Sequence, residues 1–186
     1  MDQASLAGGF ADPPQDAAHA FRGIMQAMAR PGRIETVSGV SPPAPLSIAA
    51  GTIVMTLCDP ETGLHLTGAH DTPAVRDWIT FHTGAPFVDA SDAAFVLGTW
   101  AEIELDTLPL GTADYPDRSA TVIVEQDAVR AHGATLRGPG IKDTAELNLP
   151  DIAIFQRNAA QFPLGLDFFF THGAQLAALP RSTKVT

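Results

Sequence analysis

The C-terminal segment constrains the fold most, because it combines an apolar hairpin pattern with polar residues at both ends of the hairpin. Residues 168–171 predict a buried strand, His172-Gly173 a tight turn, and residues 175–179 the returning strand. Asp167 precedes three consecutive phenylalanines, and Arg181 follows the second strand. A carboxylate beside a buried strand must be paired or hydrogen-bonded. We therefore expect Asp167 to pair with Arg181 or to accept backbone N–H bonds at the mouth of the hairpin.

Helical and strand patterns alternate through the rest of the chain. Helices are predicted over residues 13–30, 46–57, 73–83 and 151–161, and strands over 34–37, 64–67, 94–97, 120–124 and 134–137. The segment 46–57 also carries β-branched residues, but its length favours a helix. The alternation predicts one α/β domain over residues 1–186, with three layers: a mixed sheet flanked by helices on both faces.

The residue spacing also predicts caps and buried faces. Asp12 precedes two prolines and is the expected cap of the first helix, whose predicted buried face consists of Phe21, Ile24, Met25 and Met28. Thr72 and Asp151 are the expected caps of two later helices. In the last of these, the residues expected to point inward are Ile152, Phe155 and Ala159.

Composition limits the class of protein. The chain has 186 residues, of which 45% are hydrophobic, and carries a net charge of −10. No apolar run approaches the roughly 20 residues needed to span a bilayer, and no signal peptide is expected. Cys58 is the only cysteine, which fits a reducing cytoplasm. With so few Lys and Arg residues, a nucleic-acid partner is not expected.

A glycine-rich loop follows the strand predicted at 134–137. The sequence Arg137-Gly138-Pro139-Gly140 resembles a phosphate-binding turn, but Pro139 removes a central N–H donor. We therefore favour a purely structural role for this loop, namely a tight turn that needs glycine because φ is positive. Arg30, beside Pro31-Gly32, contributes either to a small positive patch or to the carbonyl end of its helix.

The remaining titratable residues carry no diagnostic constellation. His82 is expected to support the end of its helix by hydrogen-bonding the last carbonyls. His65 and His70 lack a third ligand, so no metal is expected. Cys58 fits a buried structural thiol. Lys142 lies beside Asp143, so a Schiff-base role is disfavoured. Catalytic residues stay unknown.

Five motifs in order resemble the PhnH family of the bacterial carbon–phosphorus lyase system. They are residues 21–28 with Pro31-Gly32, residues 81–86, residues 111–121 around Tyr115, residues 136–141, and residues 162–167 with 179–183. The resemblance runs from about Phe10 to Val185. One position departs from the family's common tail: Ser182 replaces a threonine, which keeps the hydroxyl and loses a methyl group.

The resemblance implies a subunit of the carbon–phosphorus lyase core complex in organophosphonate catabolism. With partner subunits, such proteins form alpha-D-ribose 1-methylphosphonate 5-triphosphate from ATP and methylphosphonate. It further implies a fold like the large domain of pyridoxal-phosphate-dependent transferases without that cofactor, a homodimer, and docking on other core subunits. This subunit is expected to be accessory, with no complete active site and no cofactor of its own.

The alternative is a stand-alone phosphate- or phosphonate-binding protein, or a transferase acting on a small anionic substrate. Candidate anion-binding or interface residues are Arg30, Arg137, Gly138, Gly140, Arg181, Ser182 and Thr183, with polar support from His82, Tyr115 and Asp167. In this alternative the arginines hold a phosphonate or nucleotide ligand, and His82 or Asp167 handles protons. The two hypotheses differ in whether these segments converge on one concave surface.

Overall fold

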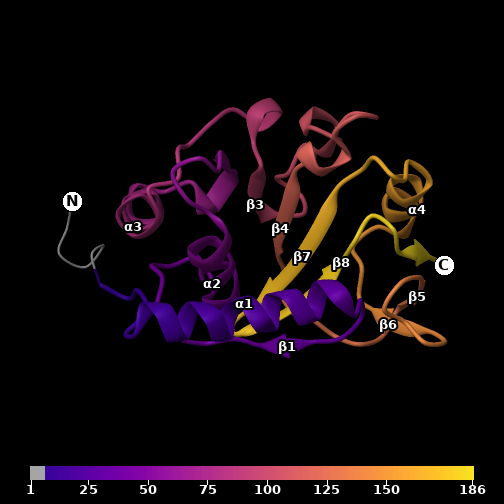
Figure 1. The fold of residues 1–186 in the computed structure, drawn as a ribbon, viewed down its shortest axis with the longest axis horizontal. Coiled ribbons are helices and arrows are strands. Elements are labelled where there is room, and N and C mark those ends of the chain that lie inside the picture. The colour runs from indigo at the N-terminus through magenta and orange to yellow at the C-terminus, as the bar shows by residue number, and fades with distance from the viewer. Residues whose placement is uncertain (1–6) are drawn as a thin grey trace.

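The computed structural model describes residues 7–186, which form a six-stranded sheet with helices along it and a smaller three-stranded sheet (Figure 1). The helices are α1 (Pro13–Ala29), α2 (Ile48–Leu57), α3 (Pro73–Thr83) and α4 (Ile152–Ala160). The strands are β1 (Glu35–Thr36), β2 (Leu64–Leu66), β3 (Phe95–Thr99), β4 (Thr121–Glu125), β5 (Ala134–Arg137), β6 (Ala145–Leu147), β7 (Asp167–His172), β8 (Gln175–Leu179) and β9 (Lys184–Val185).

The large sheet is mixed, as the sequence predicts. Its strand order is β1-β8-β7-β4-β3-β2. Strands β2, β3, β4 and β7 run parallel, whereas β8 and β1 join antiparallel. The predicted hairpin is confirmed, with Phe168 opposite Leu179 and His172 opposite Gln175. Because β7 is central, its apolar side chains are buried on both faces of the sheet.

Alternation along β7 divides its phenylalanines between two cores. Phe169 joins the core that contains α1, α2 and α3. Phe168 and Phe170 point the other way, because successive side chains of a strand alternate. Their rings stack at 6.2 Å with an interplanar angle of 7°, and Phe155 of α4 meets both edge-on. Helices therefore contact both faces of the sheet.

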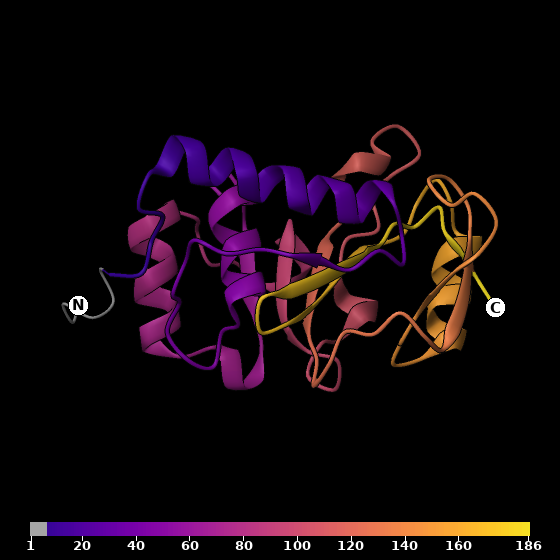
Figure 2. The same ribbon diagram turned by 90° about the horizontal axis from the view of Figure 1, so that it is seen from below.

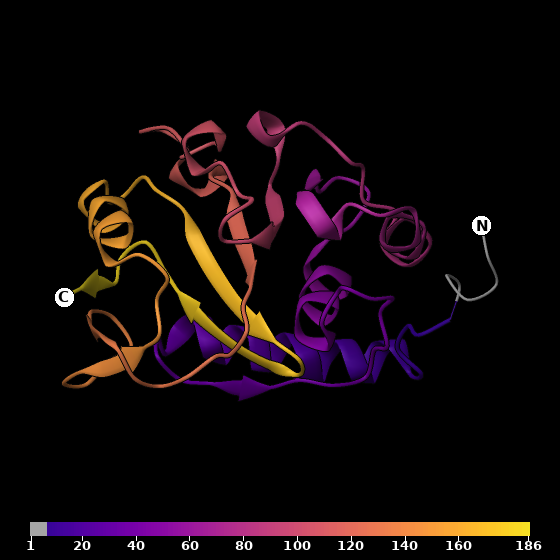
Figure 3. The ribbon, with the colours of Figure 1, turned by 180° about the vertical axis from the view of Figure 1, so that it is seen from behind.

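The two faces are covered differently. Helix α1 runs along the length of the molecule, with α2 and α3 at one end and α4 at the other (Figure 2). The second face is covered by α4, by the small sheet β6-β5-β9, and by an irregular segment around Ile103 and Leu108. Figure 3 shows β5, β6, α4 and the C-terminus together at this end.

The predicted buried face of α1 is partly wrong. Phe21 and Met25 are 49% and 47% exposed, while the buried residues are Ala20, Ile24 and Ala27. Small alanine side chains let α1 lie close to its neighbours, which turns the bulky residues of the adjacent stripe outward. In α4 the predicted inward residue Ile152 is 41% exposed, whereas Phe155 is buried as expected.

Helix caps follow the sequence except at α1. The Thr72 hydroxyl accepts the Val75 N–H at 3.2 Å, and the Asp151 carboxylate accepts the Ile154 N–H at 3.2 Å. Asp12 makes no side-chain cap bond, so that prediction is wrong. Its carboxylate instead accepts the Gln15 amide, and its own N–H donates to Asp16. The prolines at the first two helix positions carry no N–H, and the N–H of the third position, Gln15, donates to the backbone carbonyl of Asp12 at 3.1 Å and not to its side chain.

The small sheet was not foreseen beyond β5. Strand β6 pairs antiparallel with one edge of β5, and β9 pairs with the other. Both added strands are two or three residues long and partly exposed, so no alternating pattern marks them. The pairing places Lys184 opposite Arg137, which joins the tail of the chain to the glycine-rich loop.

Candidate functional site

Three motif segments far apart in the sequence meet beyond the C-terminal end of α1. A Cβ atom on Gly140 would lie 1.9 Å from the carbonyl oxygen of Ala29, and one on Gly32 would lie 2.6 Å from the Cβ of Ala145. A Cβ atom on Gly138 would lie 3.2 Å from the carbonyl oxygen of Ser182. The end of α1, the glycine-rich loop and the tail are therefore in direct backbone contact.

The glycine-rich loop is the tight turn that the sequence favoured. Gly140 has φ +82°, and the Ile141 N–H donates to the Gly138 carbonyl at 3.1 Å. A side chain at Gly140 would meet both an unfavourable backbone conformation and the carbonyl group of α1. Close packing against α1 explains why this loop needs glycine.

Asp167 and Arg181 hold the mouth of the hairpin together. The Asp167 carboxylate accepts the Arg181 backbone N–H at 2.8 Å and also bonds the guanidinium through both oxygens. Both modes predicted for Asp167 are therefore present. The guanidinium further donates to the Pro116 carbonyl at 2.6 Å and to the Ser119 hydroxyl. Arg181 thus ties the tail to the loop before β4.

These bonds separate Arg181 from the other candidate arginines. Its guanidinium is largely buried and bound to groups of the chain itself. Arg30 and Arg137 are exposed, and within residues 7–186 neither side chain makes an ion pair or hydrogen bond. The backbone segments that carry the three candidate arginines lie close together. Of these arginines, Arg30 and Arg137 have side chains without a partner in the described chain, whereas Arg181 does not.

The two hydroxyl residues of the tail differ. Thr183 is buried, its N–H donates to the Pro180 carbonyl at 2.9 Å, and its Oγ1 has no hydrogen-bond partner among residues 7–186. Ser182 is partly exposed beside Gly138. Ser182 can therefore reach a neighbouring molecule, whereas Thr183 fills space under the turn.

His82 lies at the opposite end of the molecule. Its ring packs against Trp78 at 5.0 Å and Phe81 at 4.9 Å, and its Nε2 lies 3.4 Å from the carbonyl oxygen of Ala7. The Trp78 indole N–H donates to the same oxygen at 3.0 Å. His82 therefore supports the N-terminal segment, rather than the last carbonyls of α3 as predicted.

Tyr115 is half exposed in the loop before β4. The guanidinium of Arg118 lies 4.1 Å from the centre of its ring, a cation–π contact. The next residue, Pro116, supplies the carbonyl that Arg181 binds. Tyr115 is thus close in sequence to the Asp167–Arg181 cluster, and its own ring faces solvent.

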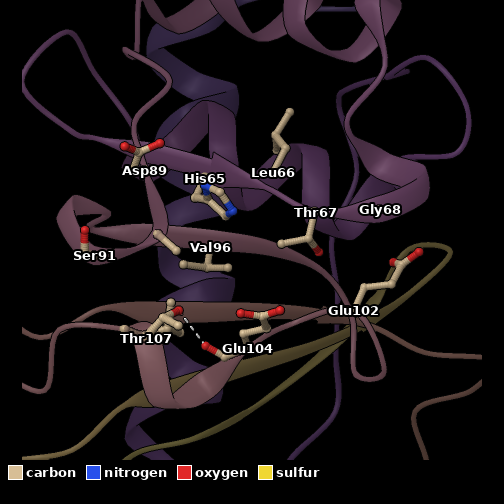
Figure 4. A pocket seen from close by; sticks show the side chains of 12 residues that line it. His65, Leu66, Thr67, Gly68, Asp89, Ser91, Val96, Glu102, Glu104 and Thr107 are labelled. Carbon is tan, nitrogen blue, oxygen red and sulfur yellow. Dashed lines mark hydrogen bonds between the residues drawn. The ribbon is translucent and has the colours of Figure 1, made fainter.

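In the part of the chain that the structure describes, none of the main cavities is lined by the predicted site residues. A cavity of about 630 Å³ lies against β2 and β3, lined by residues 65–68 and by segments before and after β3. Figure 4 shows the carboxylates of Asp89, Glu102 and Glu104 around it. The Thr99 hydroxyl and the Ala69 N–H bond Glu102 and lower its pKa below the ordinary value. Three carboxylates make this cavity unfavourable for an anion.

A second cavity, of about 570 Å³, lies beyond the carboxyl ends of β3 and β4. It contains the side chains of Trp100, Arg130 and His132. No sequence pattern pointed to Arg130 and His132, because they lie in an irregular loop without a recognised motif. Their shared position with Trp100 arises only when β3 and β4 pair.

Other chemistry is limited in the described chain. Cys58 is buried, and burial followed by the nearby Asp59 charge raises the pKa of its thiol to about 12. Residues 7–186 contain no group of three or more His, Cys, Asp or Glu side chains placed to hold a metal ion. No helix among these residues has the length and apolar character needed to cross a membrane.

The fold and these contacts define a mixed α/β protein in which the end of α1, the glycine-rich loop and the tail pack together at one end, whereas the motif at residues 81–86 lies at the other end. Residues 8–186 match the family described as "Bacterial phosphonate metabolism protein (PhnH)". The chain belongs to the PhnH family, as the motifs predicted.

Two bacterial relatives are similar to the chain over most of its length. The chain is 40% identical over 188 residues to "Alpha-D-ribose 1-methylphosphonate 5-triphosphate synthase subunit PhnH" of Rhizobium meliloti (strain 1021), covering 96% of this chain and 94% of the relative. It is 30% identical over 173 residues to "Putative C-P lyase subunit protein HtxG" of Stutzerimonas stutzeri, covering 89% and 84%. The similarity therefore spans nearly the whole of both chains.

Proposed function

We propose that this chain is a subunit of the carbon–phosphorus lyase core complex in organophosphonate catabolism. With its partner subunits it contributes to forming alpha-D-ribose 1-methylphosphonate 5-triphosphate from ATP and methylphosphonate. The observation that carries the proposal is the 40% identity, over 96% of the chain, to a relative named as a subunit of that synthase. The match to the phosphonate metabolism family over residues 8–186 supports it.

In this proposal the subunit acts within an assembly, and it contributes a surface that contacts the partner subunits. The side chains of Arg30 and Arg137, exposed and without a partner among residues 7–186, lie on segments that pack against each other. On a chain with a net charge of −10, such a patch suits an acidic surface of a partner subunit. The partly buried Asp167–Arg181 pair keeps the tail in place beside this patch.

Further features belong to the same proposal. The chain works as one domain in the cytoplasm, needs no cofactor of its own, and forms a homodimer that also docks on other core subunits. Its mixed sheet flanked by helices is compatible with a likeness to the large domain of pyridoxal-phosphate-dependent transferases. Lys142 is exposed beside the glycine-rich loop and is not needed for this role.

Co-purification tests the proposal. The tagged chain is expressed with the other core subunits, and the recovered complex is measured by size-exclusion chromatography with mass determination. Co-elution of the chain with those subunits is the expected result. Failure to co-elute under conditions where the other subunits assemble would overturn it.

Charge reversal then tests the surface. The double variant Arg30→Glu with Arg137→Glu is expected to reduce recovery in the complex. Arg157→Glu, which reverses an exposed charge on α4, is the matched control and is expected to leave recovery unchanged. Equal recovery of the double variant and the control would remove the patch from the interface.

A further inference from the structure

We propose that the outer face of α1 docks a helix of a partner subunit, and that this helix carries an apolar stripe flanked by aspartate or glutamate side chains. The face, here named the α1 stripe, consists of Pro14, Ala18, Phe21, Met25 and Ala29. This role rests on the proposed function and deepens it, because it states where a partner subunit binds and which chemistry its surface carries.

The α1 stripe is one continuous helix surface. Its members follow one another at intervals of three or four residues, and all of them are exposed. Side chains at these intervals are neighbours on a helix. The opposite side of α1 buries Ala20, Ile24 and Ala27 against the sheet, so the helix is apolar on two sides. A helix with apolar residues all round is normally covered all round, and the described chain covers α1 on one side only.

Two large side chains give the α1 stripe its apolar centre. Phe21 and Met25 lie one turn apart and are 49% and 47% exposed. No other helix of residues 7–186 has two large apolar side chains exposed to this degree within one turn. Helix α1 also lies along the outside of the molecule for its whole length (Figure 2). A contiguous exposed apolar patch of this kind marks a protein–protein contact.

The charges beside the α1 stripe indicate an acidic partner. The chain carries 21 acidic residues, yet none lies in residues 17–34. Arg22 is four residues after Ala18 and three before Met25, so it lies next to the stripe. Its side chain is exposed and makes no ion pair or hydrogen bond within residues 7–186. Arg30 directly follows the last member of the stripe, and acidic flanks on the partner helix would complement both arginines.

A second copy of the chain fits the α1 stripe less well. Symmetric antiparallel packing of two copies around Phe21 would bring the Arg22 side chains of both copies together, and each copy also carries a net charge of −10. The acidic residues Asp12 and Asp16 accept hydrogen bonds within the first turn of their own helix. The homodimer of the proposed function is therefore expected to use another face.

Binding of the purified chain to the purified remainder of the core complex tests the apolar part of this role. The double variant Phe21→Ser with Met25→Ser should weaken binding at least about tenfold, because buried aromatic and methionine side chains are typical anchors of an interface. The matched control is Ile152→Ser with Phe162→Ser, which changes two exposed apolar side chains at the start of α4 and just after its end. The control should bind as the unchanged chain does.

A charge variant tests the acidic part. Arg22→Glu should weaken binding, and the loss should shrink at about 0.5 M salt, because screening reduces the new repulsion. Arg22→Lys keeps the charge and should retain most of the affinity. Arg157→Glu, on the exposed side of α4, is the matched control and should leave binding unchanged.

The outcomes separate the docking surface from the proposed function. No binding of the unchanged chain overturns the proposed function, and the docking role of α1 with it. Binding of the unchanged chain together with equal binding of the Phe21 and Met25 double variant overturns the docking role alone, as does equal weakening by the α4 control. Sedimentation of the chain alone covers the other occupant: a double variant that loses self-association but still binds the remaining subunits makes the stripe a contact between copies and overturns the proposal. Circular dichroism confirms that each variant is folded.

Discussion

The Asp167–Arg181 pair offers the sharpest test of how the tail is held. In Arg181→Gln the guanidinium is lost, and with it the bonds to the Asp167 carboxylate, the Pro116 carbonyl and the Ser119 hydroxyl. The Asp167 carboxylate then stays near the mouth of a buried hairpin without its counterion. The variant should therefore have a lower free energy of unfolding than the unchanged chain.

The size of this loss depends on how far the two side chains are buried: that of Arg181 is 13% exposed and that of Asp167 is 23% exposed. Removing one partner of a fully buried pair costs about 3–5 kcal/mol, and exposed pairs are worth about 0.2–1 kcal/mol. With this partial exposure we expect Arg181→Gln to cost about 2–3 kcal/mol. For a chain of this length that lowers Tm by about 5–10 °C.

The assay is urea unfolding followed by circular dichroism, combined in a double-mutant cycle with Asp167→Asn. We expect a coupling energy of at least about 1 kcal/mol between the two positions. The matched control is the Asp71–Arg76 pair, also bonded through two guanidinium nitrogens but with side chains 35% and 42% exposed. Arg76→Gln should cost less than about 1 kcal/mol.

Two results would refute this reasoning. A coupling energy below about 0.5 kcal/mol would mean that the residues act independently. An equal cost of Arg181→Gln and Arg76→Gln would mean that burial does not set the strength of these pairs.

Three further predictions concern the turn, the thiol and an acidic cavity. Gly140→Ala should lower the free energy of unfolding in urea by at least about 2 kcal/mol more than Gly173→Ala does. Both glycines have positive φ, but only at Gly140 would the new Cβ atom meet the carbonyl oxygen of Ala29. Equal losses for the two variants would contradict this prediction. Burial raises the pKa of the Cys58 thiol to about 12, so the thiol should resist a thiol reagent at pH 8 until urea unfolds the chain. The free energy of unfolding should fall as the pH rises above about 9, because the unfolded thiol then ionises while the folded one does not. Rapid labelling of the folded chain would contradict this prediction. Hydrogen bonds lower the pKa of Glu102, so its contribution to the stability of the fold is present above about pH 4.5 and is lost on further acidification. The difference in free energy of unfolding between the unchanged chain and Glu102→Gln should therefore shrink below about pH 4.5. A difference that stays constant with pH would contradict this prediction.

Much of the fold was predictable because its signals are local. The hairpin of β7 and β8 follows from an apolar run, a glycine turn and a second apolar run. The caps Thr72 and Asp151 follow from the hydrogen-bonding needs of a helix start. The predicted face of α1 is right only at Ile24, because the small side chains of Ala20 and Ala27 make the close contact with the core while the bulkier Phe21 and Met25 stay exposed.

The candidate site was predictable only in part. The motif order identified the family, and the pairing of Asp167 with Arg181 followed from the cost of an unpaired carboxylate. The participation of Pro116 and Ser119 was not foreseen, since they lie 65 and 62 residues from Arg181. The exposed side chains of Arg130 and His132, which line the second cavity, carried no motif at all.

The residues alone predict most of the helices and strands, the turn at the glycine-rich loop and the membership of the PhnH family, but not strands β6 and β9. Which distant residues come together depends on the three-dimensional packing: Gly140 lies against Ala29, the tail lies against the glycine-rich loop, and Trp100 and Arg130 line one cavity at the ends of two strands. The physical reason is that turns, caps and periodicity depend on neighbours along the chain. Convergence depends instead on strand order and register, which are set by how whole faces of side chains bury one another.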